Sequence, residues 1–158
     1  MITELNIMHD GLIKKADALA EILSITENQR TVIESELPFE EIRSIIFQMN
    51  EGKQEAIKIV RNCDDMFESM LKEIGTELEA TQDNYKPQVK KLQAGIRRVM
   101  DIDVKIRVGE DENNRLLDEK RAAPTIQIQT DQPKASPLPL NHVRVTKAYE
   151  EGAKNYKG

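Results

Sequence analysis

A heptad pattern of side chains between Pro87 and Arg121 constrains the fold more than any other feature of the sequence. Core positions recur there at alternating spacings of three and four residues, which is typical of a helix packed lengthwise along other helices. The stripe is apolar in its first half and turns polar in its second, which predicts a packed half and a half that is exposed or waits for a covering partner. The stripe consists of Val89, Leu92, Ile96, Val99, Asp103, Ile106, Glu110, Asn113 and Leu117.

Two earlier segments carry the same kind of pattern. Residues 2–34 predict a first long helix, and residues 53–80 predict a second. The first stripe consists of Ile2, Leu5, Leu12, Ala16, Leu19, Leu23 and Ile33, and the polar His9, Thr26 and Arg30 fall in the same frame and weaken it. The second stripe consists of Ala56, Val60, Cys63, Phe67, Met70 and Ile74.

The breaks between these segments set the expected topology. Glu36-Leu37-Pro38 ends the first helix, and a short extra helix is expected from Pro38 to Met49, followed by a kink or short break at residues 50–52. The polar connector 81–87 is short enough to make its two helices antiparallel neighbours. We therefore expect an all-α fold over residues 1–121. It is an elongated antiparallel bundle or coiled coil of three long helices, with the short helix after the first.

Composition agrees with long helices and separates the last part of the chain. Charged residues make up 32% of the 158 residues and aromatic residues 4%, with no Trp, a balance that favours amphipathic helices over a sheet. Residues 122–158 carry four of the six prolines and a net charge of +2, from five basic and three acidic residues. This composition predicts a disordered or extended tail.

Charge and hydropathy also limit the partners and the compartment. The first 121 residues carry 18 basic and 25 acidic side chains, a net charge of −7, which argues against nucleic acid or an anionic membrane as partner. No apolar run is long enough to cross a bilayer, and the N-terminus lacks the features of a signal peptide. With a single cysteine, a cytoplasmic location is expected.

The residues most often used in catalysis and metal binding are sparse. His9, His142 and Cys63 share no metal-ligand spacing, and Cys63 lies on a helical stripe among apolar neighbours, so burial is expected. Asp64, Asp65 and Glu68 are interpreted as a solvated helix face. We therefore expect no metal, no cofactor and no enzymatic activity.

The last part of the third helix keeps two interpretations open. Its apolar side chains lie around more than one face, at Ile102, Val104, Ile106, Val108, Leu116 and Leu117. A helix that packs on two neighbours needs such a wide stripe. A helix that docks a partner helix needs one as well. The residues alone favour neither interpretation.

Three segments resemble the FlgN-type flagellar export chaperones in the version found in clostridia and related bacteria. They are Glu51-Gly52-Lys53-Gln54, Cys63-Asp64-Asp65-Met66-Phe67 and the start of the third helix, Tyr85-Lys86-Pro87-Gln88-Val89-Lys90-Lys91-Leu92-Gln93. The resemblance covers residues 2–118 and leaves out the tail. Gly52 and Cys63 depart from the family pattern, which has glutamate and leucine there.

The resemblance implies a function and a site. Such chaperones bind the hook-filament junction (hook-associated) proteins, prevent their premature assembly and hand them to the type III export apparatus. The cargo site implied here is the C-terminal part of the last long helix, and the expected contact residues are Val99, Ile102, Ile106, Val108, Leu116 and Leu117. A monomer or weak homo-oligomer is expected. The alternative is a structural coiled-coil protein that self-associates and has no client.

Overall fold

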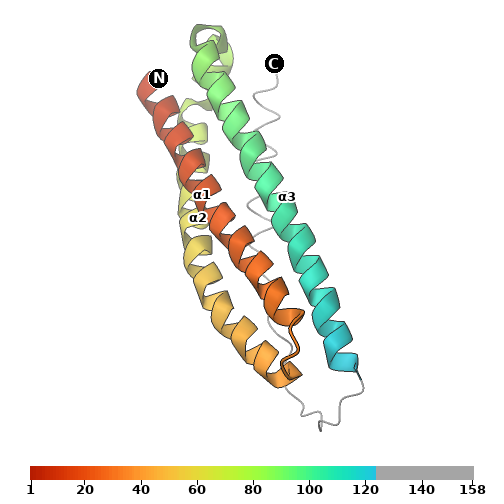
Figure 1. The fold of residues 1–158 in the computed structure, drawn as a ribbon. Helices are drawn as coiled ribbons and strands as arrows, with labels where there is room; N and C mark the ends of the chain where they lie inside the picture. The colour runs from red at the N-terminus through yellow and green to blue at the C-terminus, as the bar shows by residue number, and fades with distance from the viewer. Residues whose placement is uncertain (124–158) are drawn as a thin grey trace.

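The computed structural model describes residues 1–123, which form three long helices and no strand. They are α1 (Ile2–Ile33), α2 (Phe39–Thr81) and α3 (Lys86–Ala122), with a short 3₁₀ turn, η1 (Gln82–Tyr85), before α3. The helices lie side by side, and the two connections lie at opposite ends, so α2 runs antiparallel to both α1 and α3 (Figure 1). The all-α prediction is confirmed. The predicted tail lies outside the described residues, apart from Ala122 and Ala123.

The predicted short helix with a break after it is wrong, because α2 continues from Phe39 to Thr81 without interruption. The stretch expected to break is packed against α1: a Cβ placed on Gly52 would lie 3.3 Å from Ile25 Cδ1. Next to it, Lys53 is buried and donates a hydrogen bond to Gln29. Glycine inside a helix costs about 1 kcal/mol relative to alanine, and these contacts with α1 offset that cost.

The turn between α1 and α2 lies close to where the sequence predicted it. The carbonyl of Pro38 accepts hydrogen bonds from the backbone N–H groups of Glu41 and Ile42, both at 3.0 Å. Glu40 and Glu41 lie in the first turn of α2, where negative charge is favoured by the helix dipole. Pro38 therefore sets the start of α2 at Phe39, and α1 ends earlier, at Ile33, close to the predicted boundary.

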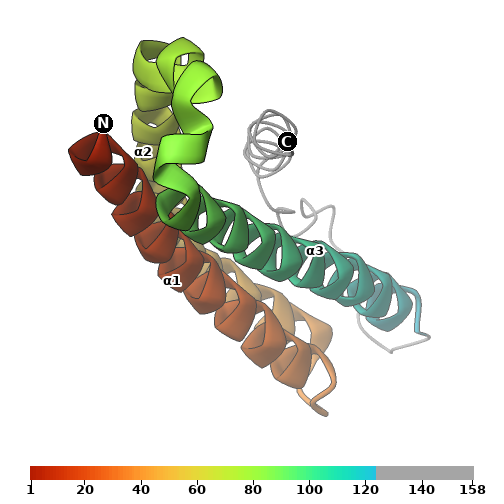
Figure 2. The same ribbon diagram turned by 90° about the horizontal axis from the view of Figure 1, so that it is seen from above.

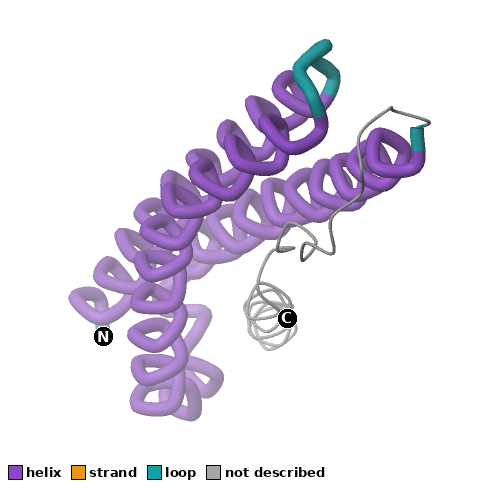
Figure 3. The backbone as a smooth tube through the Cα atoms, turned by 90° about the horizontal axis from the view of Figure 1, so that it is seen from below, coloured by secondary structure: helices purple, strands orange, loops and turns teal. Residues whose placement is uncertain are grey.

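The first helix is the centre of the bundle. It packs along both α2 and α3, whereas α2 and α3 approach each other closely at few positions. Seen from above and from below, α3 lies beside the α1–α2 pair (Figures 2 and 3). Gly95 permits one close approach, because a Cβ there would lie 3.3 Å from Leu12 Cβ. The parallel helices α1 and α3 thus approach each other closely at Gly95, where no side chain separates them.

The apolar core is divided into two parts of unequal size. The larger part extends from the N-terminal end of α1 to Ile106, and we call it the main core. The smaller part lies near the α1–α2 turn and consists of Ile33, Ile42 and Ile46, with Leu116 and Leu117 of α3 packed on it; we call it the end cluster. The main core includes Leu5, Met8, Leu12, Leu19, Ile22, Val60, Phe67, Ile74, Leu78, Leu92 and Ile96.

Candidate functional site

Two groups of buried polar side chains interrupt the apolar packing, and the first lies inside the main core. Lys15 of α1 is 0% exposed, and its Nζ lies 2.7 Å from Asp64 Oδ1 of α2. Asp103 of α3 is also buried and attracts the Lys15 charge. Arg107 donates to Asp103 Oδ2 from Nε at 3.1 Å and from Nη2 at 2.7 Å. We call these residues the central ion group, and all three helices contribute to it.

Burial has a clear electrostatic consequence for Lys15. Desolvation lowers its pKa from 10.5 to about 8, against the opposing effects of the Asp64 charge and hydrogen bond and of the Asp103 charge. Removing an ammonium group from water is costly, and a carboxylate partner recovers only part of that cost. The central ion group therefore holds, in the middle of the core, an ammonium group whose loss of hydration is only partly compensated.

The second group lies between the main core and the end cluster, and we call it the distal polar layer. It consists of Thr26, Gln29 and Arg30 of α1, Asn50 and Lys53 of α2, and Glu110 and Asn113 of α3. Lys53 is its centre: Nζ donates to Gln29 Oε1 and forms an ion pair with Glu110 Oε1. Burial lowers the pKa of Lys53, and the charge and hydrogen bond of Glu110 oppose that shift.

Further hydrogen bonds join α1 to α3 within this layer. Thr26 Oγ1 donates to Glu110 Oε1 at 2.9 Å, and Asn113 Nδ2 donates to the Thr26 carbonyl at 2.9 Å. Arg30 Nε donates to Asn113 Oδ1 at 3.2 Å. Toward α2, Gln29 Nε2 donates to Asn50 Oδ1 at 2.9 Å. The layer is a connected network, and such networks favour one register of the helices over others.

These contacts correct the interpretation of the polar heptad positions. Asp103 and Asn113 are buried, not exposed or awaiting a partner. Thr26 and Arg30, which weaken the first stripe when it is considered alone, lie opposite Glu110 and Asn113. The polar positions of the two stripes are therefore complementary. Aligning the two stripes in parallel places these polar residues opposite one another, and this alignment could have predicted their burial from the sequence.

The predicted docking residues fall into three classes. Val99 is 2% and Ile106 0% exposed, so both are core residues in the closed bundle. Ile102, Leu116 and Leu117 are half-buried. Val108 is 63% exposed, and Val104, one turn earlier, is 53% exposed. Only this pair offers large apolar surface on α3.

Among the remaining candidate residues, the prediction for Asp64 was wrong. Asp64 was expected on a solvated face together with Asp65 and Glu68, but it is buried against Lys15. Its position on the main-core side of α2 distinguishes it from the other two. Cys63 is buried as expected, and desolvation raises the pKa of its thiol. His142 lies outside the described residues.

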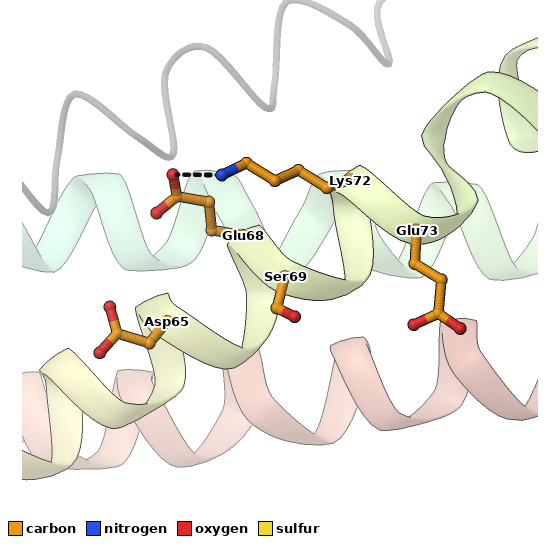
Figure 4. A pocket seen from close by; sticks show the side chains of 5 residues that line it. All are labelled: Asp65, Glu68, Ser69, Lys72 and Glu73. Atoms are coloured by element: carbon orange, nitrogen blue, oxygen red, sulfur yellow. Dashed lines mark ion pairs between the residues drawn. The ribbon is translucent and has the colours of Figure 1, made fainter.

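An open hollow lies over the outer face of α2 (Figure 4). The lining residues within the described part of the chain all come from α2, and Lys72 Nζ lies 3.8 Å from Glu68 Oε1 in an exposed i,i+4 pair. Such pairs contribute only a few tenths of a kcal/mol, about 0.3–0.5. The lining residues are Asp65, Glu68, Ser69, Lys72 and Glu73. Their arrangement is that of surface charges on a solvated helix.

A second cavity lies where α3 ends beside the last turn of α1. It has a volume of about 260 Å³ and adjoins the end cluster. It is lined by Ile33, Glu34, Leu116, Glu119, Lys120 and Ala123. Packing between α1 and α3 is therefore incomplete at this end of the bundle.

Residues 1–123 contain neither a metal-ligand cluster nor a membrane-spanning helix. No group of three or more His, Cys, Asp or Glu side chains there has an arrangement suited to a metal ion. No helix in that range is both long enough and apolar enough to cross a membrane.

Comparison of the chain with protein-family models, with curated proteins and with solved structures gave no match.

Proposed function

We propose that this protein is a binding module for a helix of another protein, and specifically a cytoplasmic export chaperone without enzymatic activity. The observation that supports docking is the exposed pair Val104 and Val108 on α3. Side chains four residues apart lie one above the other on a helix, so the two valines form one apolar strip. The resemblance of residues 2–118 to the FlgN-type chaperones supports hook-associated proteins as the clients and the type III export apparatus as the recipient.

The surroundings of the strip suit an amphipathic client helix. Asp101 lies three residues before Val104, and Asp111 lies three residues after Val108; both are exposed. Apolar contact with the valines would supply the affinity, and the carboxylates would set register and association rate. The client helix should therefore present an apolar stripe with basic residues at its edges.

The test is co-purification of the full chain with hook-associated proteins, followed by sizing of the complex. Val104→Asp with Val108→Asp should weaken the complex at least about tenfold, because a buried unpaired carboxylate is costly at an interface. Phe47→Asp is the matched control, because Phe47 is 62% exposed but lies on α2. Circular dichroism should show equal helicity for all the variants.

Two results would contradict the proposal. If no hook-associated protein forms a complex with the unmodified chain, the chaperone function is wrong. If the complex forms and the valine and Phe47 variants bind equally well, the strip on α3 is not the docking surface.

A structural protein that self-associates is the second candidate. The observation in its favour is that large apolar side chains are exposed on all three helices, including Ile7 and Ile13 of α1 and Phe47 of α2. Sedimentation velocity over a hundredfold dilution separates the two functions. A chaperone should stay a monomer or a weak dimer, whereas a self-associating protein should keep a higher oligomer through the dilution series.

A further inference from the structure

The last part of α3, from Gly109 to Ala122, is attached to the rest of the bundle in a different way from the part before it. Up to Ile106, α3 contributes to the main core. Beyond that residue, its buried contacts are the distal polar layer and the edge of the end cluster. Glycine is among the weakest helix formers, so Gly109 is a natural point for α3 to bend. We call residues 109–122 the distal segment.

The distal segment contributes little apolar burial. Its larger apolar side chains, Leu116 and Leu117, are half-buried. The cavity of about 260 Å³ lies between Leu116 and the last turn of α1. Two contacts hold the end from outside: Lys120 Nζ donates to the Ser35 carbonyl at 2.7 Å, and Arg121 lies 5.9 Å from the centre of the Phe39 ring. Contacts of this kind at a surface are individually weak.

Separating the distal segment would return charges to water. Lys53 and Glu110 are held out of water in the closed bundle, and both regain full hydration when α3 moves away. Separation of the part of α3 before Gly109 would also rehydrate the central ion group, but it would expose the apolar surface of the main core, which is the larger cost. Opening at the distal segment is therefore the least costly way to part the three helices.

Opening would uncover a surface with a specific character. Lys53 and Arg30 would lose the partners that α3 supplies, Glu110 and Asn113. One to two turns further along, the end cluster would lose its cover of leucines and expose its three isoleucines. A helix that replaces the distal segment must place a carboxylate at the position of Glu110 and apolar side chains six and seven residues later, as Leu116 and Leu117 are placed.

We propose that the distal segment separates from α1 and α2 as a unit, and that the uncovered groove receives a client helix with this pattern. This inference rests on the proposed function for the identity of the client, and it adds how the site is regulated. The closed distal segment occupies the groove and excludes the client. The exposed valines on α3 then serve as the first point of contact, because they are accessible without opening.

Hydrogen exchange on the free full-length chain tests the separation. Backbone amides of residues 111–121 should exchange together at low denaturant, with protection at least about tenfold below that of residues 92–103. The variant Lys53→Met with Glu110→Leu replaces the ion pair by apolar side chains and should raise the protection of the distal amides at least about tenfold. The matched control is Lys15→Met with Asp64→Leu, which makes the same change in the central ion group and should leave the protection of the distal amides unchanged.

The same variants test the docking groove. Lys53→Met with Glu110→Leu should weaken the client complex at least about tenfold, because it both closes the groove and removes its central cation. The control pair should bind as the unmodified chain does. Thermal unfolding of each variant shows whether it is folded, and the exchange measurement on the unmodified chain needs no variant.

The outcomes separate this inference from the proposed function. Equal protection along α3 of the unmodified chain overturns the separation, whether or not a client binds. A client complex that is unaffected by Lys53→Met with Glu110→Leu overturns the groove and leaves the chaperone function standing. Failure to bind any client overturns the function and with it the assignment of the groove, while the exchange result alone decides whether the segment separates.

Discussion

The central ion group and the distal polar layer both bury a lysine, but their surroundings differ. Lys15 has apolar packing on both sides along the bundle, with Asp64 as its bonded partner on α2. Lys53 lies at the boundary between the main core and the end cluster, and its network joins α1 and α3 directly. Lys15 is thus enclosed within the main core, and Lys53 lies between the main core and the end cluster.

The difference shows that burial alone does not determine what a charge does in a bundle. An enclosed ion pair is solvated again only when the whole core opens, so loss of either partner should cost the full penalty of an uncompensated charge. A pair at a boundary is solvated again when one segment moves. The first arrangement enforces alignment of the helices, and the second allows local separation.

The largest expected effect comes from removing the carboxylate bonded to Lys15, and the same change beside Lys53 provides the comparison. Asp64→Ala leaves Lys15 buried without its hydrogen-bonded carboxylate and should lower the free energy of unfolding by about 3–5 kcal/mol. Glu110→Ala should cost less, about 1–3 kcal/mol, because Lys53 keeps Gln29 as partner and is solvated when the distal segment moves. Urea denaturation measures both.

The control for this comparison is Lys15→Met with Asp64→Ala, which removes the charge left behind. It should recover most of the stability lost in Asp64→Ala. Equal losses for Asp64→Ala and Glu110→Ala would contradict the distinction between an enclosed and a boundary position.

An intermediate effect is expected from truncating leucines of α3 on either side of the distal polar layer. Leu92 is fully buried in the main core, and Leu92→Ala should cost about 2–5 kcal/mol. Leu117 is half-buried on the end cluster, and Leu117→Ala should cost about 1 kcal/mol. Urea denaturation of the two variants gives the difference. If Leu117→Ala proved as costly as Leu92→Ala, the distal segment would be as firmly packed as the rest of α3.

The smallest effect is a dependence of stability on pH that arises from Lys15. Because its pKa is lowered to about 8 in the folded state from 10.5, the unfolded chain binds the proton more tightly between these values. The free energy of unfolding should therefore rise with pH in this window, on the order of 1 kcal/mol between pH 7 and 9. The measurement is the difference between the unmodified chain and Lys15→Met in urea at each pH.

Lys53→Met gives the matching experiment for the boundary lysine. The pKa of Lys53 is also lowered by burial, so its contribution rises with pH in the same direction. A fall in stability with pH that disappears in Lys15→Met would show that the Lys15 pKa is raised instead of lowered.

The sequence predicted the helical architecture because apolar heptads repeat over long stretches and prolines mark the connections. It failed at residues 50–52, where intrinsic propensity favours a break but contact with Ile25 and Gln29 keeps α2 helical. Local preference is a weak guide where packing opposes it.

The buried polar groups were missed for a different reason. Lys15, Lys53 and Asp64 lie beside the apolar stripes, and their charges suggest solvent when each helix is considered alone. Their burial depends on pairs 49 and 57 residues apart, Lys15 with Asp64 and Lys53 with Glu110. Which apolar residues of α3 are buried, as Val99 and Ile106 are, and which are exposed likewise depends on which faces of α3 meet α1 and α2.

The parallel pairing of α1 with α3 has a consequence for the order of folding. Contacts between α1 and α2 start at a tight turn and extend antiparallel from it, whereas Thr26 meets Glu110 across 84 residues of sequence. Contacts of low sequence separation form faster, so the α1–α2 hairpin should assemble first, with the Lys15–Asp64 pair already made. During synthesis α3 leaves the ribosome after α1 and α2, and Lys53 therefore stays hydrated until α3 packs against them.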